Sequence, residues 1–231
     1  MTTALVSGGK DSLYAAYLCD TQGWPVDELV TIRPRDPASM MFHTPNLDLV
    51  ALQAKAWGRR YREVAVEGDG PDAERAALET AFADGDGPVV AGAIESSYQW
   101  ARLLEAADRG RRRLYAPLWR KDPARVVREE VAAGLDIRFV HLAAEPLAPE
   151  LLGTRLDLAR LAALTAMGAD GRGVHVAGEG GEFETLVVDA PFFRRRIVLD
   201  RTERTTTAST ATLTVRAAHL DDRRPSGGEP P

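Results

Sequence analysis

The chain has 231 residues, 45% of them hydrophobic and 27% charged, which is usual for a folded globular protein. This length suits one large domain or two smaller ones. The formal net charge of −5 gives no sign of the basic surface that duplex nucleic acids require. Cys19 is the single cysteine, which excludes an intrachain disulfide and fits a reducing compartment. We see no basic-then-apolar leader and no run of about 18 apolar residues, so we expect a cytoplasmic protein outside the membrane.

Strands alternate with helices over the first half of the chain. An apolar run at 3–6 predicts a strand, and it leads through SGGKDS at 7–12 into a helix at 13–18. This alternation is typical of an α/β fold, a doubly wound, Rossmann-like parallel sheet of about five strands in residues 1–120. The other strands are expected at 26–33, 61–66, 89–93 and 114–117, and the other helices at 46–57, 72–82 and 97–108.

The pattern becomes less regular after residue 120. Residues 121–220 predict a second, smaller α+β domain. Residues 221–231 are charged and rich in glycine and proline, so we expect a disordered tail there. The helices of the second domain are expected at 123–133 and 155–167, and its strands at 137–142, 174–177, 183–188, 197–199 and 211–217.

Three unusual segments follow strands of the predicted parallel sheet. SGGKDS follows the first strand, MFHTPN at 41–46 the second, and GAIESSYQ at 92–99 the fourth. Doubly wound sheets bind ligands beyond the carboxyl ends of their strands, where the strand order reverses. If the first and fourth strands are neighbours, these loops share one crevice.

The hexapeptide SGGKDS has the chemistry of a phosphate-binding loop. Gly8 and Gly9 let the backbone N–H groups approach a phosphate closely, and the N-terminus of the following helix favours an anion. Lys10 supplies a positive charge, whereas Asp11 would repel a bare phosphate and therefore suits a Mg²⁺ ion that bridges phosphates. The alternative is a glycine turn in which Asp11 and Ser12 cap the helix. The complete hexapeptide after a first strand favours phosphate binding.

SGGKDS resembles the PP-loop of the ATP pyrophosphatases, the adenine nucleotide α-hydrolase superfamily. The resemblance implies a HUP-like fold that binds ATP with Mg²⁺ and cleaves it between the α and β phosphates. AMP is transferred to an oxygen of the substrate, and a second nucleophile then displaces it. The motif alone leaves open the amidation of a carboxylate, the thiolation of a tRNA base and the formation of lysidine.

Further segments narrow this choice. Beside MFHTPN and GAIESSYQ, the chain carries Arg102, PLW at 117–119, GEGGEFET at 178–185 and DAP at 189–191. Together they resemble the motifs of the diphthine–ammonia ligase family, from residue 5 to about residue 193. The resemblance implies ATP-dependent amidation of diphthine, a modified histidine of elongation factor 2. Ammonia is the nitrogen donor, an acyl-adenylate the intermediate, and AMP and pyrophosphate are released in this last step of diphthamide biosynthesis.

The resemblance and the residue chemistry give three sets of candidate site residues. The predicted catalytic residues are Lys10, Asp11, Glu182 and Glu184, with Asp11 as the magnesium ligand. The predicted ATP-binding residues are Ser7, Gly8, Gly9, Lys10, Asp11, Ser12, His43, Gly92, Ser97 and Gln99. The predicted substrate-binding residues are His43, Asn46, Tyr98, Glu179, Gly180, Gly181, Glu182, Glu184 and Thr185. The glutamates of the last set could bind ammonium or the trimethylammonium group of diphthine, or could form a solvated acidic hairpin.

The predicted partners are elongation factor 2 and ammonium, with no stable nucleic acid and no membrane. The arginine clusters at 109–113 and 194–196 are expected to be solvated faces. The histidines lack metal-ligand spacing, so we expect no zinc. A homodimer is compatible with the sequence. Two other functions stay open: a PP-loop enzyme that adenylylates another acceptor such as tRNA, and an ATP-binding sensor without turnover.

Overall fold

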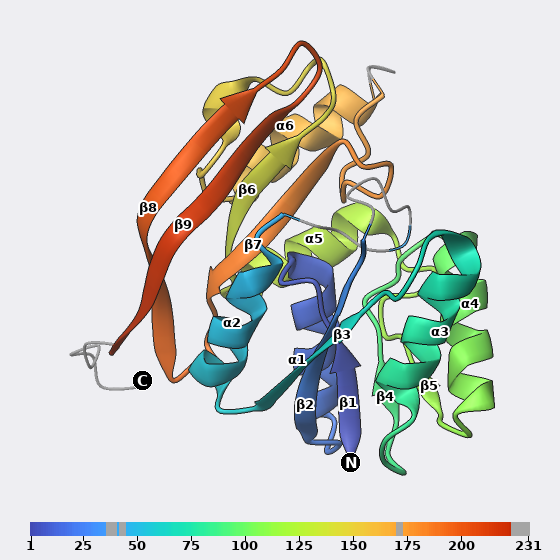
Figure 1. Cartoon of the computed structure of the whole chain (residues 1–231). Coiled ribbons are helices and arrows are strands. Elements are labelled where there is room, and N and C mark those ends of the chain that lie inside the picture. The colour runs from blue at the N-terminus through green and yellow to red at the C-terminus, as the bar shows by residue number, and fades with distance from the viewer. Residues whose placement is uncertain (36–40, 42–44, 170–172, 223–231) are drawn as a thin grey trace.

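The computed structural model describes residues 1–35, 41, 45–169 and 173–222 (Figure 1). Its first sheet has five parallel strands in the order β3-β2-β1-β4-β5. The predicted α/β sheet is therefore confirmed, and β1 and β4 are neighbours. The strands are β1 (Thr2–Leu5), β2 (Val26–Arg33), β3 (Arg60–Ala65), β4 (Val89–Val90) and β5 (Leu114–Tyr115).

Helices cover both faces of this sheet. They are α1 (Lys10–Thr21), α2 (Val50–Trp57) with a 3-10 turn before it (Leu47–Leu49), α3 (Gly70–Phe82) and α4 (Ser97–Arg109). Successive strand residues point to opposite faces, so Leu29 packs in the cluster with α1 and α2, while Val30 packs in the cluster with α3 and α4. The strand order reverses between β1 and β4, which makes this position the switch point of the sheet.

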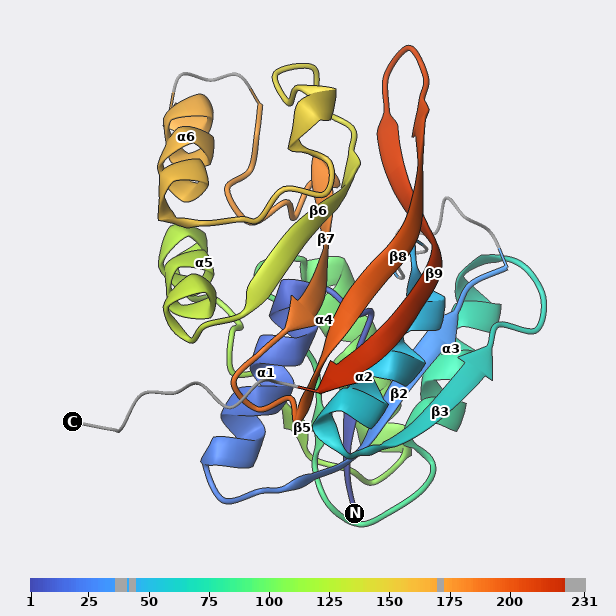
Figure 2. The ribbon, with the colours of Figure 1, turned by 90° about the vertical axis from the view of Figure 1, so that its left-hand side faces the viewer.

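A second sheet has four antiparallel strands in the order β7-β6-β9-β8. Its strands are β6 (Asp136–Leu142), β7 (Phe183–Asp189), β8 (Arg195–Thr206) and β9 (Ala211–Asp222), and its helices are α5 (Pro123–Ala132) and α6 (Leu158–Ala169), with a 3-10 turn at Pro149–Leu151. Strands β8 and β9 form a long ribbon that extends past the rest of the sheet (Figure 2). This sheet is the predicted α+β part.

One hydrophobic cluster joins the two sheets. It contains Leu13 of α1, Val50 of α2, Phe139 of β6 and Val187 of β7, all without solvent exposure. The shared core holds the start of β7 against the start of α1. The division of the chain at residue 120 into two domains stays a prediction. No helix among the described residues is long and apolar enough to span a membrane.

Several local predictions differ from the structure. The predicted strand at 174–177 is a turn, because side chains bind its backbone: the His175 N–H donates to Glu182 Oε1 at 3.0 Å. The predicted strands at 197–199 and 211–217 are longer, because β8 and β9 pair along their whole length. This pairing includes Asp221 and Asp222, so the prediction that the disordered tail begins at residue 221 is wrong for these two residues. Residues 223–231 lie outside the described part.

Helix α6 begins later than predicted. Asp157 accepts the Arg160 N–H at 2.8 Å and so caps α6, whereas Leu156 is still bonded to β6.

One arginine of the cluster at 109–113 is buried. Arg112 is 5% exposed, and its guanidinium donates to carbonyl oxygens that include that of Gly87 at 2.6 Å. The prediction of a solvated face is therefore wrong for Arg112, because backbone carbonyls take the place of water around its guanidinium.

Candidate functional site

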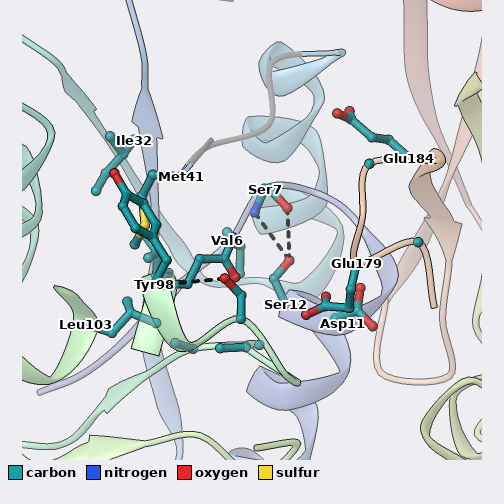
Figure 3. A pocket seen from close by; sticks show the side chains of 18 of the residues that line it. Val6, Ser7, Asp11, Ser12, Ile32, Met41, Tyr98, Leu103, Glu179 and Glu184 are labelled. Carbon is teal, nitrogen blue, oxygen red and sulfur yellow. Dashed lines mark hydrogen bonds between the residues drawn. The ribbon is translucent and has the colours of Figure 1, made fainter. Parts of the chain in front are cut away.

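A cleft of about 430 Å³ lies beyond the carboxyl ends of β1 and β4 (Figure 3). The loops after β1 and β4 both line it, so the predicted shared crevice exists. The glycine-rich loop before β7, residues 178–182, lines it as well. Apolar side chains gather at one end, among them Ile32, Met41 and Leu103. Polar groups gather at the other end, among them Ser7, Asp11, Ser12, Glu179 and Glu184.

The SGGKDS loop wraps around the N-terminus of α1. Gly8 has a φ of 86°, a left-handed conformation that glycine adopts without strain. The Ser12 hydroxyl accepts the Ser7 N–H at 3.3 Å and donates to the Gly9 carbonyl at 3.3 Å. Because α1 starts at Lys10, its unpaired N–H groups and dipole favour an anion at this place.

Lys10 is buried under this loop, with 2% of its side chain exposed. Its ammonium donates to Asp11 Oδ2 and to the Ala177 carbonyl, each at 2.7 Å. Burial by itself would lower the pKa of Lys10, but the attraction of Asp11 and Glu130 outweighs burial and raises it. Lys10 therefore stays charged. Asp11 lines the cleft and Lys10 does not.

Glu130 is a fully buried carboxyl beside this pair, on α5 of the second sheet's layer. Burial, followed by repulsion from Asp11, raises its pKa well above the ordinary value. Neither oxygen of Glu130 receives a hydrogen bond within the described residues, and the same holds for Asp11 Oδ1. A proton on Glu130 relieves the repulsion between the two carboxyls. No sequence pattern indicated Glu130, because a glutamate in EEVA on an amphipathic helix resembles a surface residue.

The three glutamates of the GEGGEFET segment have different surroundings: Glu179 and Glu182 lie in the glycine-rich loop and Glu184 lies in β7. Glu179 and Glu184 line the cleft. Burial, then repulsion from Asp11, raises the pKa of Glu179. Glu182 instead binds its own loop: its oxygens accept the N–H groups of His175 and Gly180, each at 3.0 Å. The predicted catalytic role of Glu182 stays a prediction, and its observed contacts are those of a turn-stabilising residue.

The middle of β7 is bonded directly to the SGGKDS loop. The Val187 N–H donates to the Gly8 carbonyl at 3.0 Å, and Thr185 Oγ1 accepts the Lys10 N–H at 3.2 Å. The buried amide of Gln53 joins both segments, since its nitrogen donates to the Gly8 carbonyl at 2.9 Å and the Val187 carbonyl at 2.8 Å. Thr185 thus supports the loop, and Gln53 is a supporting residue that no sequence pattern indicated.

The loop after β4 forms the opposite wall. Gly92, Tyr98 and Gln99 line the cleft, as does Ser96, while Ser97 does not. Ser96 caps α4 by accepting the Gln99 N–H at 3.3 Å. The Arg102 guanidinium lies 3.5 Å from the centroid of the Tyr98 ring, so one face of this ring is occupied. Gly180 and Gly181 complete the lining from the glycine-rich loop.

The MFHTPN segment is described only in part. His43 lies outside the described residues, and Met41 lines the apolar end of the cleft. Asn46 has a φ of 61°; its side chain donates to the Leu213 carbonyl at 2.9 Å and accepts the Val215 N–H at 2.7 Å. Asn46 thus joins this segment to β9, and its predicted substrate contact stays a prediction.

Comparison with known proteins relates this architecture to one family. The family model for the diphthamide synthase N-terminal domain matches residues 1–109, and that for the C-terminal domain matches residues 122–220. A diphthine–ammonia ligase of Danio rerio is 33% identical over 224 residues, covering 86% of each chain. The Homo sapiens ligase of the same name is 29% identical, covering 87% of this chain and 83% of its own.

Among solved structures, a predicted tRNA methyltransferase subunit from Methanocaldococcus jannaschii covers 83% of this chain and 98% of its own. Its TM-score is 0.45 and its identity 14%. The family assignment rests instead on the two family models and on the curated relatives, which cover most of the chain. On that evidence the chain belongs to the diphthine–ammonia ligase family.

Proposed function

We propose that the chain is an ATP-dependent ligase that amidates the carboxylate of diphthine on elongation factor 2 with ammonia, the last step of diphthamide biosynthesis. The relatives named diphthine–ammonia ligase support the reaction. The observation that carries the proposal is the SGGKDS loop at the switch point of the sheet, with Asp11 and Glu179 facing one cleft.

The two ends of the cleft suit the two ends of ATP. Ile32, Met41 and Leu103 offer an apolar surface for the adenine ring. The SGGKDS loop offers hydroxyls, a helix N-terminus and the buried charge of Lys10 to the phosphates. This orientation places the adenine ring at the apolar end and the triphosphate at the polar end, which also holds Glu179 and Glu184.

Magnesium fits the residues at the phosphate end. Asp11 Oδ1 has no hydrogen-bond partner in the described part of the chain, and carboxylate oxygens are ligands that Mg²⁺ prefers. We propose that Asp11 would hold the ion at this end of the cleft. When bound, Mg²⁺ neutralises charge on the departing pyrophosphate. Lys10 acts with Asp11 by keeping this carboxylate in place through their ion pair.

The proposed reaction has two steps. The diphthine carboxylate attacks the α phosphorus, the α–β bond breaks, and pyrophosphate leaves with an acyl-adenylate formed. Ammonia then attacks the acyl carbon, and AMP leaves with the electrons of the acyl–oxygen bond. Ammonium must first lose a proton. Glu179 is suited to accept it, because burial and the nearby Asp11 raise its pKa, and Glu184 lies in the same cleft.

The test is incubation of the chain with diphthine-bearing elongation factor 2, ATP, Mg²⁺ and ammonium. We expect AMP and pyrophosphate in equal amounts, and an amidated histidine peptide by mass spectrometry. Elongation factor 2 without the diphthine modification is the control and should give neither product. ADP and orthophosphate would contradict cleavage at the α–β bond, and AMP formation with tRNA alone would favour a different acceptor.

A further inference from the structure

His175 links the two loops that face each other across the cleft. It lies in the turn before β7, and its Nδ1 accepts the N–H groups of Ala177 and Glu179, each at 3.3 Å. A backbone N–H can only donate, so Nδ1 carries the lone pair and Nε2 carries the proton. Nε2 then donates to Glu95 Oε2 at 3.0 Å.

Glu95, in the loop after β4, makes a second hydrogen bond in the opposite direction. Its N–H donates to Glu179 Oε2 at 3.2 Å, while its carboxylate receives the His175 proton. Two hydrogen bonds, one to His175 and one to Glu179, therefore join the segment before β7 to the opposite wall of the cleft. Because both run through Glu95, the relative position of the two walls depends on this residue and on His175.

The same imidazole also supports the proposed phosphate end. It holds the N–H of Ala177, whose carbonyl receives the Lys10 ammonium at 2.7 Å. It holds the N–H of Glu179, whose carboxyl lines the cleft. One ring thus orders the residue that binds Lys10 and the residue that faces the substrate.

We infer that His175 is a positioning residue, which acts through Glu95 to hold the cleft at its working width with Lys10 and Glu179 in place. The inference rests on the proposed function of the cleft. His175 lies outside the residues that line the cleft, so its role is to orient groups and not to exchange protons with the substrate. Its neutral, Nε2-protonated form is the form that makes all three bonds.

The first test measures kcat, the KM for ATP and backbone hydrogen exchange in His175→Ala and Glu95→Ala. We expect the His175→Ala kcat to fall by up to about 100-fold, because small misplacements of catalytic groups have effects of this size. Exchange at the amides of Ala177 and Glu179 should become faster. Glu95→Gln keeps an acceptor oxygen for Nε2 and should restore most of the rate that Glu95→Ala loses.

A double-mutant cycle tests whether the two residues act as one unit. His175→Asn keeps an acceptor near the Nδ1 position but does not reach Glu95, so its kcat should fall about as much as that of Glu95→Ala. The double variant, which carries both substitutions, should have a kcat only slightly lower than either single variant. Additive losses would overturn the link. His219→Asn is the matched control, because His219 makes the same kind of pair with Asp200 at 2.8 Å on the β8–β9 ribbon.

The outcomes separate this inference from the proposed function. Failure of the wild-type chain to form AMP refutes the function, and the exchange measurement still decides whether His175 orders the loop. Unchanged exchange at Ala177 and Glu179 in His175→Ala overturns the inference even if the wild type is active. The inference is also overturned if His175→Ala loses thermal stability but keeps the wild-type kcat and KM for ATP.

Discussion

Gly92 lies directly against Ser12: a Cβ at position 92 would be 2.6 Å from the Ser12 backbone nitrogen. Real Cβ atoms do not come this close to backbone, so Gly92→Ala must push the loop after β4 away from the SGGKDS loop. We expect ATP affinity to fall by at least about tenfold and stability to fall by about 1–3 kcal/mol. Calorimetric titration with ATP and thermal unfolding measure the two effects.

Gly23→Ala is the control for this substitution. Gly23 has a φ of 87° and open space around it, so alanine costs about 1–2 kcal/mol through backbone strain alone. Its turn lies at the far end of α1, so ATP affinity should not change. Equal ATP affinity in Gly92→Ala and Gly23→Ala would contradict the close approach of the two loops.

Lys10→Met should abolish turnover and also destabilise the fold. The substitution removes the cation between Asp11 and the buried Glu130, and removal of one partner of a buried ion pair costs about 3–5 kcal/mol. Asp11→Asn should abolish turnover with a smaller loss of stability, because Glu130, without the repulsion from Asp11, can release its proton and balance the charge of Lys10. Chemical denaturation and AMP release distinguish the two variants. A Lys10→Met variant that keeps its stability would show that Lys10 is not needed to balance these carboxyls.

Substitution of Glu182 should lower stability, whereas substitution of Glu179 should raise the KM for ammonium. Glu182→Ala removes the acceptor of two backbone N–H groups, and we expect a loss of about 1–3 kcal/mol in the free energy of unfolding. Glu179→Gln removes a carboxylate from the cleft, so we expect a higher KM for ammonium with little effect on stability. Initial rates at varied ammonium concentration test this assignment. The opposite pattern, with Glu182 controlling the ammonium KM, would reverse the two roles.

Local patterns predicted the parallel sheet, because short apolar runs, helix periodicity and glycine-bearing loops are properties of neighbouring residues. They also predicted that SGGKDS and GAIESSYQ share a crevice, and this prediction is confirmed by the order of β1 and β4. Gln53, Glu130 and His175 were not found in this way. Each acts through contacts with residues far away in the chain, such as Gln53 with Val187. The apolar residues at 174–177 predict a strand, but the segment is a turn, because the side chain of Glu182 and not a neighbouring strand accepts the His175 N–H.

The buried carboxyl of Glu130 should make stability depend on pH. Its pKa is raised in the folded chain from an ordinary value of 4.5, so the folded state holds a proton that the unfolded chain releases. The free energy of unfolding therefore falls as pH rises from about 4.5 toward the folded pKa, by at most about 1.4 kcal/mol per pH unit. Glu130→Gln cannot lose this proton, so its stability should fall less steeply over the same range.

Urea denaturation in magnesium-free buffer at several pH values measures this difference. Glu145→Gln is the matched control, because Glu145 is exposed and its substitution should leave the slope of the wild type unchanged. At neutral pH we expect Glu130→Gln to be at least as stable as the wild type, since the amide keeps the size of the side chain and can donate to Asp11. Parallel curves for wild type and Glu130→Gln would show that Glu130 releases its proton at the same pH in both states. The carboxyl would then be charged beside Asp11, and Lys10 alone would have to balance both.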